Sequence, residues 1–165
     1  MKNRSINILI VSMLLLTLMG VMLAAFLGKA KEDYPNEITV KENGVTESIL
    51  EVRDLKLNPT ESMEYDVNLL CDASGMYHIS LDYNETEDGG MKPFVDVTVK
   101  VGGEQVYEGK LEELLRDGVV IECEGELQSK EPLVLSICYL MPYDVGNEAQ
   151  GTYSDFDISI TIKKS

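Results

Sequence analysis

From residue 38 to the C-terminus, apolar and polar residues alternate with a period of two, and this pattern limits the fold more than any other feature of the chain. In "FVDVTVKV" every second residue from Val95 to Val101 is valine, and "MEYDVNLLC" and "MYHISLDY" alternate in the same way. Successive side chains of a strand point to opposite faces of a sheet, so these runs indicate strands with one buried face.

Eight or nine such strands are predicted, at 38–40, 45–57, 63–71, 76–83, 95–101, 104–107, 119–123, 133–140 and 156–162. Asn43-Gly44 and Gly102-Gly103 each predict a tight hairpin. Only "KLEELLRDG" has helical spacing, with Gly118 as its stop signal. Because strands and helices do not alternate along the chain, we predict an all-β, antiparallel two-layer β-sandwich of jelly-roll or Greek-key type with one short helix.

An uncharged apolar run at 6–27 precedes this domain. As a helix it would span roughly 33 Å, against about 30 Å of bilayer hydrocarbon. The sequence leaves two interpretations open: a retained N-terminal hydrophobic helix that anchors the chain, or a signal peptide cleaved near "GKA" at 28–30. We predict a signal or anchor at 1–30, a linker at 31–37 and a β-sandwich at 38–165. Either interpretation places the domain at the cell surface or outside the cell.

Residues 31–165 carry 11 basic and all 29 acidic residues, a formal net charge of −18. Such a domain repels phosphate backbones, so we predict that nucleic acid is not a partner. The three cysteines, Cys71, Cys123 and Cys138, lie in apolar strand-like runs, where buried free thiols are expected. A bridge between Cys123 and Cys138 is the one disulfide that we consider.

The sequence offers few residues for catalysis. His78 is the only histidine and falls on the polar side of its strand, so we predict that the protein is not an enzyme and holds no cofactor. The one candidate cation site is the predicted polar loop "NETEDGG" with the two residues before it. There, Asp82, Asn84 and Asp88 have the oxygen ligands that Ca²⁺ prefers.

The heptapeptide "VGNEAQG" at 145–151 precedes the last predicted strand. We expect Gly146 and Gly151 to adopt positive φ at its two ends. We also expect the side chains of Asn147 and Gln150 to bond backbone groups within the loop and so fix the register of the last strand.

This loop and an earlier segment carry a resemblance. "MPYDVGNEAQG" before a final alternating strand, and "LKLNPTESMEYDVNL" with Leu57, Pro59 and Tyr65, resemble the TasA/camelysin family of exported proteins of Gram-positive bacteria. Thr60 stands where that family usually has Gly. The resemblance implies a jelly-roll subunit that assembles outside the cell, often in a biofilm matrix, and some relatives are described as metalloendopeptidases.

Three functions remain open from the sequence. The first is a non-enzymatic surface or matrix protein, such as a fibre subunit that associates with itself or with other matrix proteins. Its strand with Ile38 and Val40 pairs either in its own domain or with a neighbour's sheet. The second is a binding module, tethered to the membrane through residues 6–27, for a wall polymer or partner protein. The third is a secreted metalloendopeptidase.

Overall fold

A computed structural model describes residues 37–165. The predicted signal or anchor at 1–30 and linker residues 31–36 lie outside the described residues. Within 37–165, every helix is too short or too polar to cross a membrane.

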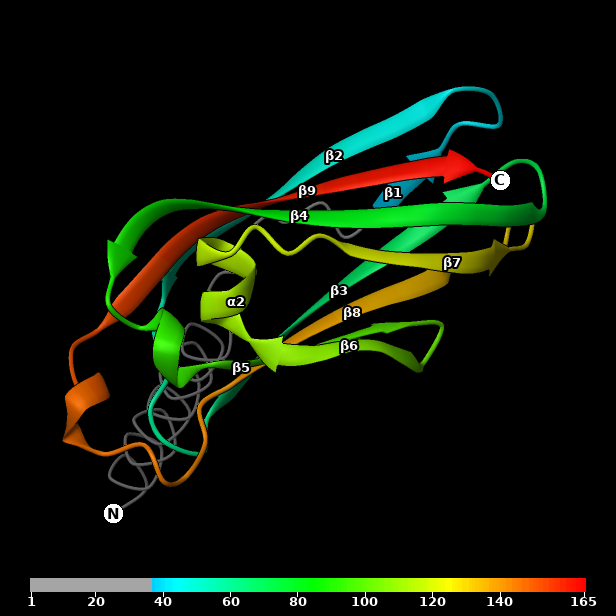
Figure 1. The fold of residues 1–165 in the computed structure, drawn as a ribbon. Coiled ribbons are helices and arrows are strands. Elements are labelled where there is room, and N and C mark those ends of the chain that lie inside the picture. Colours follow the sequence, from blue (N-terminus) through cyan, green and yellow to red (C-terminus); the bar gives the residue numbers. More distant parts are fainter. Residues whose placement is uncertain (1–36) are drawn as a thin grey trace, which may run out of the picture. The chain divides into compact units, whose positions relative to one another are not determined.

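Nine strands form two sheets in this part of the chain (Figure 1). The strands are β1 (Glu37–Val40), β2 (Val45–Leu55), β3 (Ser62–Cys71), β4 (Gly75–Gly89), β5 (Asp96–Val101), β6 (Glu104–Lys110), β7 (Ile121–Leu127), β8 (Leu133–Leu140) and β9 (Tyr153–Lys164). One sheet has the order β2-β9-β4-β7 and the other β1-β3-β8-β5-β6.

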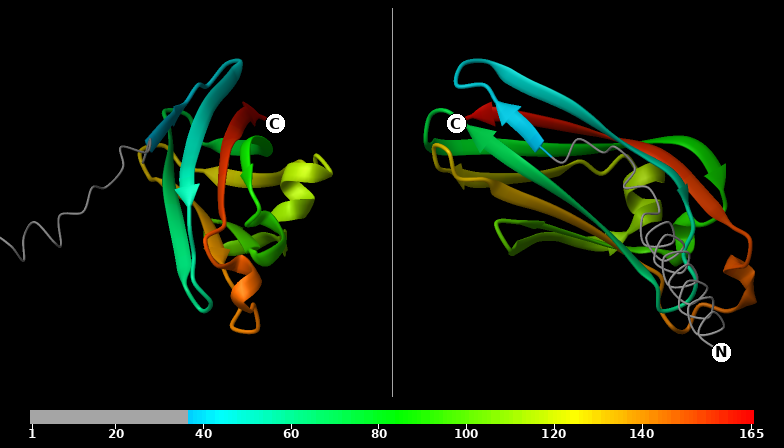
Figure 2. Two further views of the ribbon diagram at one scale, coloured as in Figure 1. Left: turned by 90° about the vertical axis from the view of Figure 1, so that its left-hand side faces the viewer. Right: turned by 180° about the vertical axis from the view of Figure 1, so that it is seen from behind.

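The pairing of β2 to β9 is that of a jelly roll. β2 pairs with β9, β3 with β8, β4 with β7 and β5 with β6, as in one long hairpin folded over on itself. Two further antiparallel pairs, β4 with β9 and β5 with β8, complete the sheets. The two layers face each other in the views of Figure 2. The predicted fold class is therefore confirmed.

The first strand departs from the predicted pattern. β1 lies at the edge of the five-stranded sheet and runs parallel to β3, with Ile38 opposite Leu69 and Val40 opposite Cys71. β2 belongs to the other sheet. The predicted hairpin at Asn43-Gly44 is therefore wrong: these residues turn the chain from one sheet to the other, and the Lys41 amide bonds Thr46 Oγ1 at 2.8 Å.

The core lies between the sheets, on the faces that the alternation predicts. Its centre is a cluster of aromatic rings in which Tyr139 contacts Tyr65 and Phe156 edge-on, with centroids 5.7 and 5.6 Å apart, and Phe156 contacts Tyr83 at 5.8 Å. These rings come from β3, β4, β8 and β9, so they join the two layers. Aromatic pairs at such spacings stabilise a core beyond the area that they bury.

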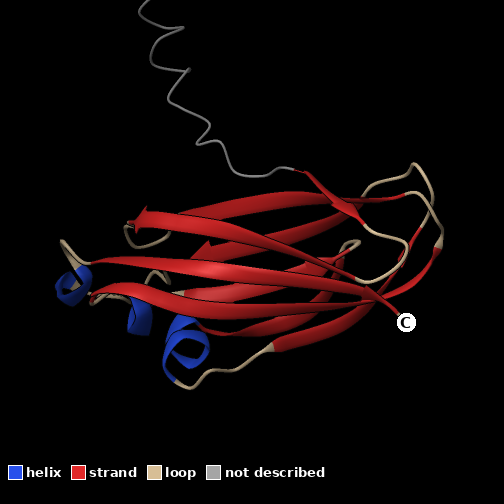
Figure 3. Cartoon of the chain, turned by 90° about the horizontal axis from the view of Figure 1, so that it is seen from above, coloured by secondary structure: helices blue, strands red, loops and turns tan. Residues whose placement is uncertain are grey.

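Three short helices gather toward the end of the described domain opposite its C-terminus (Figure 3). They are η1 (Lys92–Phe94), α2 (Leu111–Arg116) and η2 (Asn147–Ala149). The predicted helix α2 buries Leu111 and Leu114, and Gly118, with φ +62°, follows its C-cap as predicted.

Several strand boundaries differ from the prediction, among them those of β4 and β7. The predicted loop "NETEDGG" is mostly strand, because β4 continues to Gly89 and pairs with β9 as far as Tyr153. The strand expected at 119–123 begins at Ile121, and Val119 and Val120 are exposed before it. The outer part of β4 has polar side chains on both faces. Because its sequence therefore lacks the apolar alternation of the other strands, it did not predict a strand there.

Candidate functional site: a pocket at one end of the sandwich

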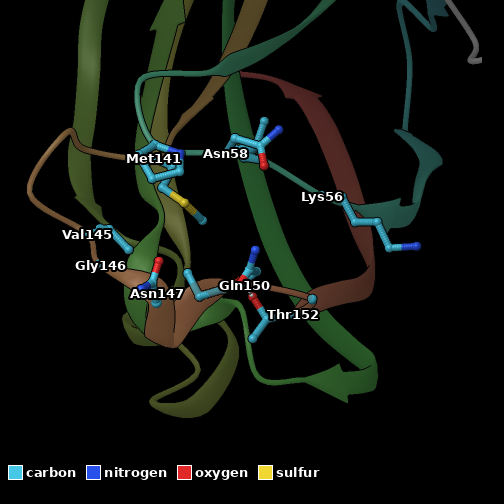
Figure 4. A pocket seen from close by; sticks show the side chains of 12 residues that line it. Lys56, Asn58, Met141, Val145, Gly146, Asn147, Gln150 and Thr152 are labelled. Carbon is cyan, nitrogen blue, oxygen red and sulfur yellow. Dashed lines mark hydrogen bonds between the residues drawn. The ribbon is translucent and has the colours of Figure 1, made fainter.

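Two segments that are far apart in the sequence meet around a pocket of about 400 Å³ (Figure 4). One segment connects β2 to β3 and the other connects β8 to β9. The lining residues are Lys56, Leu57, Asn58, Pro59, Met141, Val145, Gly146, Asn147, Ala149, Gln150, Gly151 and Thr152.

Backbone hydrogen bonds hold the two segments together. The Thr60 amide donates to the Met141 carbonyl at 2.8 Å, and the Met141 amide donates to the Glu61 carbonyl at 3.0 Å. Thr60 reaches this position with φ +74°, a conformation that a β-branched residue rarely adopts. Glycine would adopt this conformation without steric cost.

The loop "VGNEAQG" is braced by backbone groups together with the Thr152 hydroxyl and the Glu148 carboxylate. The Gln150 amide bonds the Asn147 carbonyl at 3.0 Å, and Thr152 Oγ1 donates to the Ala149 carbonyl at 2.7 Å, beside the buried Ala149 side chain. Gly151 has the predicted positive φ, +78°. Gly146 does not: its φ is −85°, and its amide donates to the Glu148 carboxylate, so the prediction of positive φ there is wrong.

The side chains of Asn147 and Gln150 do not brace the loop as predicted. Neither amide group has a hydrogen-bond partner among residues 37–165, and both side chains line the pocket. Asn58, which no sequence pattern indicated, differs from them: its side-chain amide donates to Glu61 at 3.0 Å. Hydrogen bonds from the Asn58 backbone and side chain hold the pKa of the Glu61 carboxyl below its ordinary value.

The pocket has an apolar part and a polar part. Leu57, Met141 and Ala149 are buried, whereas Asn147 and Gln150 are exposed at its surface. Its only charged lining side chain among the described residues is Lys56, whose amino group pairs with Asp54 at 2.5 Å. This lining contains no carboxylate, thiol or imidazole, so its chemistry is that of hydrogen bonding and apolar contact.

The candidate Ca²⁺ ligands are not brought together. Asp82 and Asn84 lie opposite Ser159 and Asp157, and Asp88 lies farther along β4, opposite Ser154. Six residues of extended strand span about 20 Å, so Asp82 and Asp88 are too far apart to share one ion. Across 37–165, no three His, Cys, Asp or Glu side chains are grouped so that they could hold a metal.

The amino group of Lys92 lies beside Asp88, where a Ca²⁺ ion was considered. This amino group lies 2.8 Å from both the Asp88 and the Glu85 carboxylates. The hydrogen bond from Lys92 holds the pKa of the Asp88 carboxyl below its ordinary value. The acidic segment "NETEDGG" is thus neutralised in part by a lysine of the following turn.

The remaining selected residues lie elsewhere. Ile38 and Val40 are buried beneath the edge of the sheet, and His78 lies on the outer face of β4, 3.9 Å from Glu122. All three cysteines are free. Cys123 lies on the same face of β7 as the inward Ile121 and Gly125. Cys138 lies between the inward Ile137 and Tyr139 of β8 and therefore faces outward. The considered Cys123–Cys138 bridge does not form.

Fold and site together define a jelly-roll domain with a small polar pocket at one end. No family model matches the sequence, and no characterised protein matches it either. Solved structures with a similar arrangement include the EclA C-terminal domain, a sugar-binding protein, at 13% identity and a TM-score of 0.40, covering 82% of this chain and 87% of that one.

Two other similar structures are more distant. A family 35 carbohydrate-binding module from Clostridium thermocellum has 8% identity and a TM-score of 0.34, covering 73% of this chain and 92% of that one. PliG, a periplasmic lysozyme inhibitor of Salmonella Typhimurium, has 13% identity and a TM-score of 0.28, covering 77% and 97%. At these scores the similarities carry no argument about function.

Proposed function

We propose that this chain is an exported, non-enzymatic structural subunit of the cell surface or extracellular matrix, and that its copies associate by exchanging β1. The observation that carries the proposal is the position of β1. This strand has four residues, lies at a sheet edge and follows the N-terminal segment directly. Strand addition of this kind uses backbone hydrogen bonds for affinity and side-chain pockets for specificity.

The size of β1 allows it to leave its own domain while the rest stays folded. Ile38 and Val40 are its only buried side chains, at 5% and 2% exposure. Burying each contributes about 1.5–3 kcal/mol. A domain of this kind is typically stable by about 5–15 kcal/mol. Release of β1 is therefore less costly than unfolding, and the same contacts form again in a neighbouring copy.

The edge of β3 offers further room for a neighbour's strand. β1 pairs only with Asn68–Cys71, whereas β3 begins at Ser62. On that side, residues 62–67 have no strand neighbour within the described part of the chain. An exposed strand edge is a template for pairing with another chain.

The N-terminal sequence supports the proposed location. The apolar run at 6–27 directs the domain out of the cell as an anchor or as a cleaved signal. A retained anchor would keep β1 near the membrane, whereas cleavage near residue 30 would free it. We therefore expect the form that begins near Lys31 to be the one that assembles.

Electron microscopy of this processed form at increasing concentration tests the proposal. We expect fibres, and we expect the double variant Ile38→Ser with Val40→Ser to abolish them because it removes the side chains that anchor β1. Thr39→Ser is the matched control, since Thr39 lies between them and is exposed. Fibres that persist in the double variant, or after deletion of 31–42, would refute assembly through β1.

A second candidate function, a membrane-tethered binding module for a wall polymer or partner protein, is favoured by one observation. The end pocket presents two amide side chains without protein partners beside an apolar surface. A stable monomer that retains a wall component, and loses it when the pocket is altered, would select this function over assembly.

A further inference from the structure

We infer that the end pocket binds a neutral saccharide unit. This inference deepens the second candidate function, and it does not depend on exchange of β1. It rests on the side chains that line the pocket, on the charge around them and on the kind of backbone that forms the walls.

The pocket presents groups that match a polyhydroxylated ligand. Each of the Asn147 and Gln150 amides offers two N–H donors and one oxygen acceptor, and within residues 37–165 neither group is used. A sugar hydroxyl both donates and accepts, so adjacent hydroxyls can satisfy an amide on both its atoms. Figure 4 shows both side chains, from the loop before β9, at the pocket.

The apolar lining residues suit the C–H face of a sugar ring. Val145 and Pro59 are apolar side chains of the lining, and Met141 is a lining residue whose side chain is fully buried. Its thioether is polarisable and adapts to an irregular partner. A volume of about 400 Å³ lies within the range of about 300–1,000 Å³ that is typical of small-molecule sites.

The surrounding charge excludes an anionic ligand. The domain carries a large excess of acidic residues, which repels anionic polymers. Lys56, the only cation among the described lining residues, is already paired with Asp54 at 2.5 Å. A neutral ligand meets neither repulsion nor an unpaired charge.

The backbone around the pocket disfavours an extended peptide. Peptides commonly bind by adding a strand to an exposed sheet edge. The pocket walls are instead the connections between β2 and β3 and between β8 and β9, with η2 among them. Where β2 and β9 approach the pocket they are paired with each other, Leu55 opposite Ser154, so a peptide cannot add between them.

Tyr143 adds an independent indication. It lies in the same β8–β9 connection, two residues after Met141, and its side chain is 84% exposed. Tyr139 of β8 and Met141 are buried. The exposed ring of Tyr143 offers a face on which a second sugar unit of a chain can stack.

Nuclear magnetic resonance on the full chain tests this inference, in a zwitterionic detergent because sugar-headed detergents would compete. The probes are glucose, galactose, mannose and N-acetylglucosamine, each added up to about 50 mM so that weak, millimolar binding is detected. Glucuronic acid serves as the charged counterpart. We expect at least one neutral sugar to shift the side-chain amide signals of Asn147 and Gln150 and the methyl signal of Met141, and glucuronic acid to shift them less.

Variants separate binding at the pocket from other effects. Asn147→Ala and Gln150→Ala should each weaken binding about tenfold, because each removes hydrogen bonds to the ligand. Asn84→Ala is the matched control, an exposed amide on the outer face of β4, and should leave the affinity unchanged. The backbone signals of each variant report whether the fold is intact.

Two results would overturn the inference. One is that none of the four neutral sugars shifts the pocket signals of the folded chain. The other is that a sugar binds but Asn147→Ala, Gln150→Ala and Asn84→Ala affect its affinity equally. If the sugars fail while a wall component is still retained through the pocket, the saccharide inference falls and the binding-module function survives.

Discussion

The hydroxyls of Tyr83 and Tyr139 meet across the two sheets, and replacing them gives the sharpest test of the core. Tyr83 lies on β4 and Tyr139 on β8; they are 3% and 0% exposed, and their oxygens are 3.5 Å apart. Tyr139→Phe leaves the Tyr83 hydroxyl buried without this partner, and Tyr83→Phe does the reverse. A buried unpaired polar group costs about 1–3 kcal/mol, and the length of this bond places each variant near the lower end, at about 1–2 kcal/mol.

The double variant should be close to the wild type. With both hydroxyls removed, two apolar rings of nearly the same shape face each other and no polar group is left unpaired. Urea unfolding followed by circular dichroism gives the free energies of unfolding of the three variants. Their slopes against urea concentration should equal that of the wild type. If the two single effects simply add up in the double variant, the hydroxyls do not interact and the reasoning is refuted.

The same pair predicts a dependence on alkaline pH. Burial raises the pKa of both Tyr83 and Tyr139 above the ordinary value for tyrosine. Because their pKa is higher in the folded chain, these tyrosines lose their hydroxyl protons first in the unfolded chain. Their contribution to the free energy of unfolding is therefore complete below pH about 10 and is lost as pH rises further. The double Phe variant should therefore lose less stability than the wild type between pH about 9 and 11. Equal losses would show that other groups cause the alkaline unfolding.

The remaining predictions concern the pocket segments and the thiols. Thr60→Gly should raise the free energy of unfolding by about 0.5–1 kcal/mol in urea titrations, because relief of strain at φ +74° exceeds the entropic cost of glycine; a loss of stability would contradict this. Gly151→Ala should lower the melting temperature by an amount corresponding to about 1–2 kcal/mol because its φ is +78°. Gly146→Ala should change it little, since its φ is −85° and only the end of the exposed Glu148 side chain is displaced. Equal effects of the two glycine variants would show that φ is not the cause. A thiol reagent should label the outward Cys138 of the folded protein before the buried Cys71, as mass spectrometry of the labelled peptides would show; the reverse order would contradict the assigned faces.

The alternation of apolar residues predicted most of the sandwich. The valines of β5 and the inward residues of β3, β8 and β9 are buried as expected, because each strand has one face toward the core. The pattern carries no information about which strands pair, however. Asn43-Gly44 has the composition of a hairpin turn, yet β1 pairs with β3, since the partner of a strand depends on contacts far along the chain.

The candidate site was predicted in its position but not in its role. Gly146, Asn147, Gln150 and Gly151 lie together, as their spacing implies, and they line a pocket. The sequence could not show that Asn147 and Gln150 are without partners, because that depends on how far the loop stands from β2 and β3. Nor could it show that Lys92 lies beside Asp88, in the place where a cation was considered.

A cross-linking experiment tests exchange of β1 most directly. In a background with Cys71→Ala, Cys123→Ala and Cys138→Ser, one preparation carries Thr39→Cys and a second carries Leu70→Cys, since these residues are opposite each other on β1 and β3. The two processed chains are mixed, concentrated and oxidised. In the control, the second chain carries Gln105→Cys in place of Leu70→Cys, because Gln105 lies on β6 at the other edge of the same sheet. The account predicts a disulfide between the Thr39→Cys and Leu70→Cys chains and none with the Gln105→Cys chain. No link between the first two in assembled material, or equal linkage to Gln105→Cys, would contradict it.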